Sequence, residues 1–263
     1  MPTVSLLPGV LPGFAQSRAM VLATVCGLLA AGGVAHAQHR PFDPDEGTLS
    51  SIKPRIPEPM VFDLIRPLGA QRGEIEVNSL FRFSPTIRPR RLLWAPEIEY
   101  AFLEGYGIEF ELPMENAGVD TFKGAIQGTL PGPMKKVFIH GWQVLGEVAK
   151  ESSESKVDVM YLAGARWHRH WSAFSMTGVE REEGTRAAYA FLGNYSLFYH
   201  QRDTVSYGME TNFKGRGYSG RGFLMMPQAQ FRKHRVNVQV GAGWRWFGGS
   251  NGLQIGWRIS REF

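Results

Sequence analysis

Hydrophobic and polar residues alternate along the last part of the chain, residues 253–263. The residues at one set of alternate positions are apolar, namely Leu253, Ile255, Trp257, Ile259 and Phe263. Successive side chains of a β-strand point to opposite faces, so a period of two with one apolar face predicts a strand between an apolar and a polar medium.

The same alternation recurs from residue 73 onward, in segments of about ten residues that are separated by turn-forming residues. The segments are marked by apolar positions within 75–83, 98–102, 108–112, 122–130, 138–144, 157–167, 171–181, 189–197, 205–213, 223–231, 236–244 and 253–263. Only the segment at 171–181 has no clear apolar face. Twelve such segments predict an all-β, antiparallel chain.

These strands are expected to form a transmembrane up-and-down β-barrel over residues 74–263. After residue 37 no apolar run approaches the 18 or so residues of a membrane helix, and a closed barrel is the other structure that satisfies every backbone group in lipid. The predicted outward faces carry one charge, Arg261, and one ionisable ring, His140. A soluble β-sandwich also hides one face, but its other face would not collect acidic residues so consistently.

The connections between the segments are consistent with such a barrel, which has short periplasmic turns and longer outer loops. The expected outer loops are 84–96, 113–120, 149–156, 180–185, 214–220 and 245–252. The expected periplasmic turns are 103–105, 131–136, 166–170, 200–204 and 232–235.

The first 37 residues have the features of a secretory signal peptide. Arg18 precedes an apolar stretch at 19–31, and Ala35-His36-Ala37 provides a cleavage site. The alternative is a buried N-terminal helix. Cys26, the only cysteine, lies in this region, so the remaining chain has no disulfide, thiol nucleophile or cysteine metal site. The net charge of +5 is mild and without dense basic runs, which argues against nucleic-acid binding.

Residues 38–73 are rich in proline and show little alternation, so they are expected to form an extension that precedes the barrel. Within it, residues 60–67 are predicted to form either a short helix or an apolar anchor. Two interpretations remain open for the extension. It is either a flexible periplasmic tail, which would suit a periplasmic partner, or a plug that folds into the barrel mouth.

Charged residues on the predicted inner face are the candidates for function. A tight turn at Glu104 pairs Glu99 with Glu109 and Glu97 with Glu111, and like charges placed opposite each other destabilise a strand pair. Basic residues are therefore expected to face them, and the candidates are Arg82, Lys123, Arg166, Arg232 and Arg258. This lumen is either a rigid ion-pair network or a narrow, water-filled path that selects polar solutes.

The terminal strand, with Trp257 and the final Phe263, resembles the last strand of bacterial outer-membrane β-barrels. That resemblance implies export to the outer membrane of a Gram-negative cell, where the insertion machinery reads this strand. Residues 61–69, 73–78 and 226–231 also resemble the transporters that are grouped with the phenol meta-pathway barrels. This second resemblance implies uptake of small, aromatic compounds.

The expected function is therefore a narrow channel or transporter for small solutes, and the alternative is a non-conducting, partner-binding barrel. An outer-membrane enzyme is the least expected of the three functions. Twelve-stranded outer-membrane phospholipases have a His and a Ser two residues apart on the lipid face. Here the residue two positions after His140 is Trp142, so the serine is missing. His168 and His170 lack acidic partners for a metal site. We expect no catalytic residue, cofactor or metal.

Overall fold

A computed structural model describes residues 54–62, 64–132, 137–152, 154–183, 187–216 and 220–263 of the chain. The predicted signal peptide, residues 1–37, and residues 38–53 of the predicted extension lie outside the described residues. Within the described ranges, no helix is both long and apolar enough to cross a membrane.

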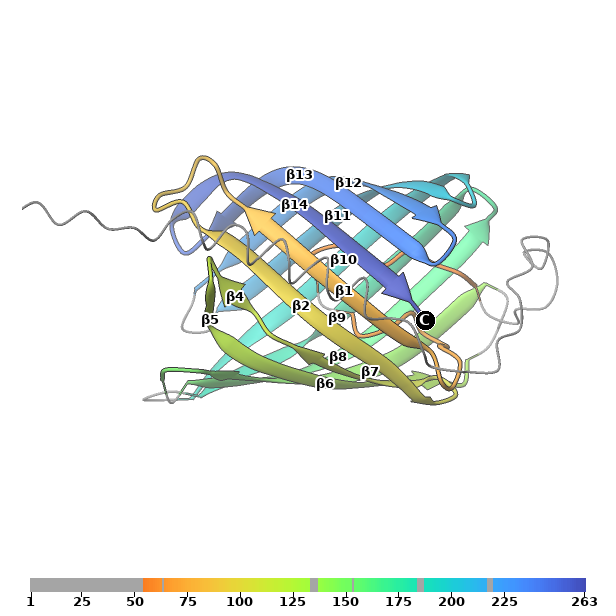
Figure 1. Ribbon diagram of the computed structural model, residues 1–263, viewed down its shortest axis with the longest axis horizontal. Helices are drawn as coiled ribbons and strands as arrows, with labels where there is room; N and C mark the ends of the chain where they lie inside the picture. Colours follow the sequence, from red (N-terminus) through yellow and green to blue (C-terminus); the bar gives the residue numbers. More distant parts are fainter. Residues whose placement is uncertain (1–53, 63, 133–136, 153, 184–186, 217–219) are drawn as a thin grey trace, which may run out of the picture. The chain divides into compact units, whose positions relative to one another are not determined.

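The described residues form a closed, antiparallel barrel of 12 strands, which confirms the predicted fold class (Figure 1). Its strands are β1 (Ile75–Phe83), β2 (Leu92–Leu103), β3 (Tyr106–Glu111), β6 (Thr121–Leu130), β7 (Phe138–Ala149), β8 (Ser155–His168), β9 (Trp171–Glu183), β10 (Ala188–Arg202), β11 (Val205–Arg216), β12 (Gly222–Lys233), β13 (Val236–Phe247) and β14 (Ser250–Glu262). Two short strands, β4 (Met114–Glu115) and β5 (Gly118–Val119), form a hairpin in the connection between β3 and β6.

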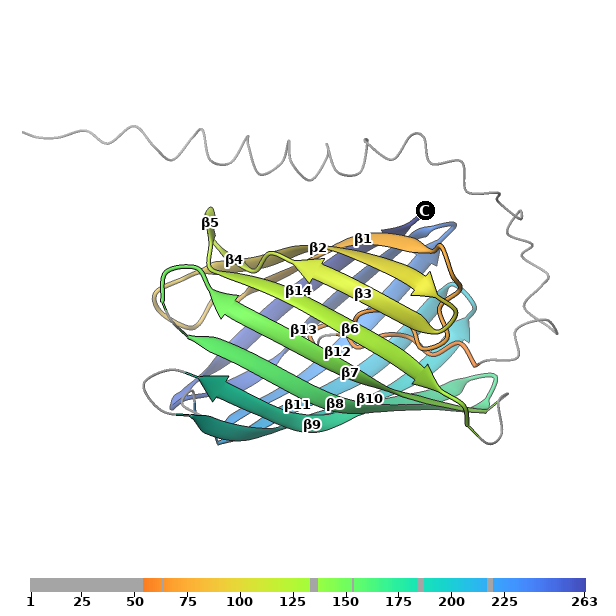
Figure 2. The ribbon, with the colours of Figure 1, turned by 90° about the horizontal axis from the view of Figure 1, so that it is seen from below.

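The barrel closes because β1 pairs with both β2 and β14. Every other barrel strand pairs with its neighbours along the chain, as Figure 2 shows from a second direction. A closed sheet leaves no unpaired strand edge, which is a requirement for a β-structure in lipid.

Several strands extend further than the alternation predicts. β2 begins at Leu92, so the predicted loop 84–96 is too long, and Pro96 pairs with Ser79 inside the sheet. The predicted loop 245–252 is wrong as well, since only Gly248 and Gly249 connect β13 to β14. Both glycines have a positive φ, 56° and 84°, which lets two strands be joined by so short a connection.

The outer side of the barrel is apolar. Large hydrophobic side chains are exposed there on most strands, for example Phe110 at 50% and Val159 at 56%. Strand β9 departs from this arrangement, which explains why its sequence shows no clear apolar face. Phe174 and Met176 in its middle are buried on the inner side, whereas Ser175 between them points outward.

Residues 54–62 and 64–72, called here the lumenal segment, contact the inner side of the barrel. Near its start, the carbonyl of Arg55 accepts a hydrogen bond from Arg166 at the end of β8. Near its end, the carbonyl of Ala70 accepts one from Gly105, in the turn between β2 and β3. The lumenal segment is irregular, so its described residues do not form the short helix that was one of the two alternatives for residues 60–67.

Candidate functional site

Two rows of glutamates face each other on the inner side of β2 and β3. Glu97 is opposite Glu111 and Glu99 is opposite Glu109, which confirms the predicted register. All four side chains are at most 7% exposed. Four carboxylates so close together and so far from solvent need compensating charge, because a buried ion without a partner is strongly unfavourable.

Arg258 and Lys123 supply part of that charge. Arg258 on β14 donates to Glu97 across 2.7 Å and lies 3.5 Å from Glu99. Lys123 on β6 donates to Glu111 across 2.6 Å. Two of the predicted basic residues therefore reach the glutamates, and Arg258 also lies 3.8 Å from Glu58 of the lumenal segment.

Arg66 of the lumenal segment is a third cation, and the sequence analysis did not identify it. Its guanidinium is 2% exposed and lies 2.9 Å from Glu76, 3.0 Å from Glu74 and 3.7 Å from Glu99. The available signal was an arginine next to the apolar pair Leu64 and Ile65, since a charge beside such residues needs a partner elsewhere.

Glu210 on β11 holds the lumenal segment by its backbone. The carboxylate is fully buried and accepts hydrogen bonds from the amides of Met60 at 2.7 Å, Val61 at 3.2 Å and Phe62 at 3.0 Å. Asn212 and Gln228 also donate to it, at 2.8 and 3.0 Å. Such charge-assisted bonds to several donors are how a protein accommodates a lone buried carboxylate.

An apolar cluster on the inner side of β7 to β10 forms the opposite boundary of the site. Among the described residues this lumenal apolar cluster comprises Leu64, Leu68, Ile139, Met160, Leu162, Phe174, Met176, Leu192 and Phe198. Leu64 and Leu68 come from the lumenal segment, so this segment lies between an apolar and a charged part of the wall. The sequence analysis expected inward charge and did not anticipate the cluster.

Two inward glycines make room for Met60 on the remaining side. A Cβ atom added to Gly241 or Gly256 would lie 2.8 or 2.9 Å from the terminal methyl of Met60. A side chain at either position would therefore require the Met60 methyl to move. Glycine there allows the lumenal segment to approach the backbone of the wall.

The structure does not bring all the predicted cations to the glutamates. Arg166 is partly buried and donates to the carbonyls of Arg55 and Arg169, so the expectation that it faces the glutamates is wrong. Arg232 is exposed and lines a cleft of about 10 Å³ with Glu58 and Glu76. Arg82 lies on the inner side of β1, where its charge acts on Glu111.

Trp257 and Phe263, the residues of the predicted insertion signal, lie at the outer surface and at the chain end. Trp257 stacks on Phe81 with ring centroids 5.2 Å apart. The Phe263 amide donates to the carbonyl of Ile75 at 2.9 Å, which fixes the terminus to β1. Their role in insertion stays a prediction.

A buried Ser-His-Ser arrangement near the end of β10 was also not anticipated. The Nε2 of His200 lies 2.8 Å from the hydroxyl of Ser172, and its Nδ1 lies 3.1 Å from that of Ser206. A hydrolytic triad orients its histidine with a carboxylate, and here a serine takes that place. The arrangement therefore does not by itself indicate a hydrolase.

No protein-family model matches this chain, and no curated protein matches it either. Among solved structures, the chain is similar to the NanC porin, with a TM-score of 0.54, 7% identity, and coverage of 71% of this chain and 97% of NanC. A bacterial polysaccharide outer membrane secretin gives a TM-score of 0.42 at 7% identity, covering 72% of this chain and 98% of its own. Ail, the attachment invasion locus protein of Yersinia pestis, gives 0.23 at 8% identity, covering 73% and 100%. At these identities, the likeness to NanC shows the barrel fold alone.

Proposed function

We propose that this protein is an outer-membrane β-barrel of a Gram-negative cell and acts as a narrow channel for small solutes that its own lumenal segment closes. Export by a signal peptide at residues 1–37 and insertion through the terminal strand are parts of the proposal. The apolar outer side of the barrel supports a location in lipid, because a charged side chain at mid-bilayer would cost about 2–4 kcal/mol.

The single observation that carries the channel proposal is that a piece of backbone occupies the lumen. In barrels of about eight strands the side chains of the wall fill the interior. Here Met60, Leu64 and Arg66 of the lumenal segment are at most 2% exposed inside a wall of 12 strands. Withdrawal of the lumenal segment would leave a passage about as wide as an extended peptide.

The path of the lumenal segment is compatible with withdrawal. Its first contact is near the turn between β8 and β9, and its last is at the turn between β2 and β3. Connections in an up-and-down barrel alternate between its two ends. The turn between β8 and β9 comes four connections after the turn between β2 and β3, so both turns lie at the same end. The lumenal segment thus enters and leaves by one end, and it can move out without being threaded through the barrel.

The lining of the vacated path indicates the kind of solute. One part of the wall presents the glutamates and Arg258, and the other presents the lumenal apolar cluster. A small molecule with a ring and a polar group would match both. This agrees with the aromatic compounds that the resemblance to the phenol meta-pathway barrels implies.

Conductance in planar bilayers tests the proposal. The chain without residues 1–37 is expected to stay closed for most of the time, and a variant that also lacks residues 38–72 is expected to show discrete open steps. A folded deletion variant without any conductance would contradict the channel. Folding is verified beforehand by the different gel mobilities of boiled and unboiled protein.

A non-conducting, partner-binding barrel is the second candidate, and the lumenal apolar cluster favours it. Its nine buried apolar residues, counted over the described part of the chain, resemble the core of a soluble domain, and such packing stabilises a fixed structure. That candidate predicts no conductance with or without the lumenal segment, and a periplasmic partner that co-purifies through residues 38–73. An enzymatic role is not part of either proposal.

A further inference from the structure

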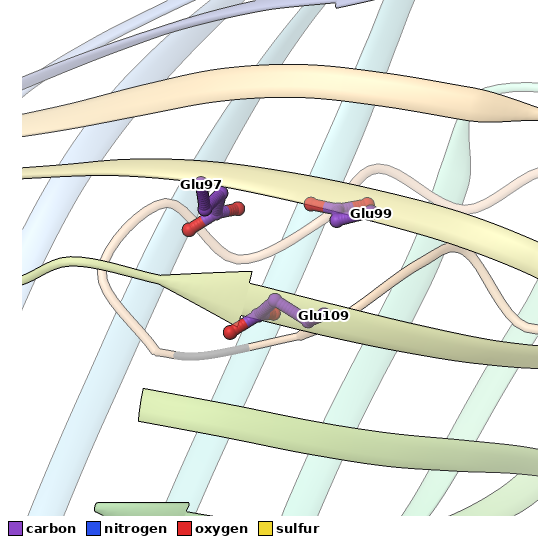
Figure 3. A group of neighbouring side chains, drawn as sticks. All are labelled: Glu97, Glu99 and Glu109. Atoms are coloured by element: carbon purple, nitrogen blue, oxygen red, sulfur yellow. The ribbon is translucent and has the colours of Figure 1, made fainter. Parts of the chain in front are cut away.

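Three glutamates from two neighbouring strands bring their carboxylates together on the inner side of the barrel (Figure 3). Glu97 and Glu99 belong to β2, and Glu109 lies opposite Glu99 on β3. One oxygen of each carboxylate lies within 4.8 Å of the others. Ca²⁺ binds oxygen at about 2.3–2.6 Å, so two oxygens on one ion are at most about 5 Å apart. The spacing therefore suits three ligands of a single ion.

Glu109 is the member of this cluster without a partner. It is 5% exposed, and within the described part of the chain neither of its carboxylate oxygens has a hydrogen-bond partner. Glu97 and Glu99, by contrast, both accept from Asn78. Buried charged groups are normally paired, hydrogen-bonded or bound to a metal. In its charged form Glu109 consequently requires a positive ligand, and the described residues do not supply a hydrogen-bonded one.

The charge balance around the cluster points the same way. Among the described residues, Glu76, Glu97, Glu99, Glu109 and Glu111 are the carboxylates buried in this part of the lumen, and Glu58 beside them is 13% exposed. The cationic groups that contact them or act on them are Arg66, Arg82, Lys123, Arg232 and Arg258. One negative charge is left over, so this part of the lumen stays net negative and favours a bound cation.

We infer that Glu97, Glu99 and Glu109 bind one divalent cation of the hard, oxygen-preferring class, and that Ca²⁺ fits best. All three ligands are carboxylates, which suit Ca²⁺, Mg²⁺ and Mn²⁺ rather than softer metals. Ca²⁺ tolerates irregular geometry, whereas Mg²⁺ requires a near-ideal octahedron. The ligands are fixed by two paired strands, so they cannot rearrange freely around a small ion.

This site lies beside the contacts that hold the lumenal segment, but it does not depend on the channel proposal. Glu99 is 3.7 Å from Arg66, and Glu97 is 2.7 Å from Arg258. A cation at Glu109 would complete this network whether or not the barrel conducts. Binding and conductance are measured separately, so failure of one proposal leaves the other open to its own test.

Calcium binding to the folded, full barrel tests the inference. The protein is stripped with EDTA, freed of the chelator and titrated with CaCl₂ by calorimetry, and the bound calcium is counted by elemental mass spectrometry. We expect one Ca²⁺ per chain and a higher unfolding midpoint when Ca²⁺ is present. A parent chain that binds no Ca²⁺ overturns the inference and assigns the surplus charge to protons.

Glu109→Gln is the informative variant, since it removes a ligand without breaking an ion pair. It is expected to lose saturable Ca²⁺ binding, and in EDTA to be at least as stable as the parent. Glu147→Gln is the matched control, because Glu147 lies on β7 and pairs with Lys156 instead. The control is expected to bind like the parent. Binding that persists in Glu109→Gln overturns the assignment of the site.

Discussion

The carboxylate of Glu210 accepts a hydrogen bond of 2.7 Å from the backbone amide of Met60, a residue 150 positions earlier in the chain. The bond joins the middle of a barrel strand to the lumenal segment. The amides of Val61 and Phe62 converge on the same carboxylate. One side chain of the wall thereby binds three consecutive residues of the lumenal segment.

Glu210→Gln is expected to loosen these three residues without unfolding the barrel. Hydrogen bonds to a charged group contribute about 1.5–3 kcal/mol, and the neutral amide retains only one of the two acceptor oxygens. Hydrogen exchange at the amides of Met60, Val61 and Phe62 should accelerate about tenfold or more, since about 1.4 kcal/mol corresponds to a factor of ten. Exchange in Glu147→Gln is the control and should match the parent. Unchanged exchange in Glu210→Gln would contradict the role given to this carboxylate.

The lumenal apolar cluster should contribute measurably to stability. Leu64→Ala removes a side chain that is 1% exposed, and truncation of a buried leucine costs about 2–5 kcal/mol because a cavity remains. The free energy of unfolding in denaturant measures this effect. Val179→Ala, which truncates a side chain that is 48% exposed on the outer side, should cost much less. Equal losses in both variants would mean that Leu64 is not packed inside the barrel.

Arg258→Met should be strongly destabilising, by about 3–5 kcal/mol, because it leaves buried carboxylates without their cation. A second substitution, Glu97→Gln, should recover part of this loss. Arg91 provides a control, since its ion pair with Glu115 has the same 2.7 Å length as that of Arg258 with Glu97. The Arg91 side chain, however, is 53% exposed. Arg91→Met should cost at most about 1 kcal/mol. Similar losses for the two arginines would argue against a buried network.

Glu58 should make the lumenal segment sensitive to pH. Burial and the neighbouring Glu76 raise the pKa of the Glu58 carboxyl from 4.5 to about 7. The positive charges of Arg258, Arg66 and Arg232 oppose this shift. The folded state therefore holds the proton more tightly than the unfolded state, and the associated stability is lost as the pH rises from about 4.5 through 7.

Denaturant unfolding at pH 5 and pH 8 measures this dependence. Glu58→Gln carries no titrating group at this position, so its stability relative to the parent is expected to increase from pH 5 to pH 8. A difference between parent and variant that does not change with pH would contradict the shift.

The strands could be predicted because their pattern is local. Alternation places the strands without knowledge of any contact, and the tight turn at Glu104 fixes the pairing of Glu97 with Glu111. The limits of the strands were less predictable, since Pro96 and the residues around Gly248 suggest loops although the sheet includes most of them.

The contacts of the lumenal segment could not be predicted, because they join residues that are far apart in the sequence. Nothing near Glu210 indicates that it accepts hydrogen bonds from Met60, and nothing near Arg66 identifies Glu99 as its neighbour. Phe174 and Met176 point inward, where they share an apolar cluster with Leu64 and Leu68 of the lumenal segment. If the lumen were lined by polar residues alone, apolar residues at positions 174 and 176 would have predicted that this face of β9 points outward.

The accessibility of residue 64 tests most directly whether the lumenal segment closes the barrel. Leu64→Cys in the chain without residues 1–37 carries a single thiol, since Cys26 is the only native cysteine. Labelling of the folded barrel with a charged thiol reagent is predicted to be slow at this position and fast at the exposed control position, Arg72→Cys. Unfolding the barrel should make the two rates equal. Labelling of Leu64→Cys in the folded barrel as fast as that of Arg72→Cys would show that the lumenal segment does not occupy the lumen.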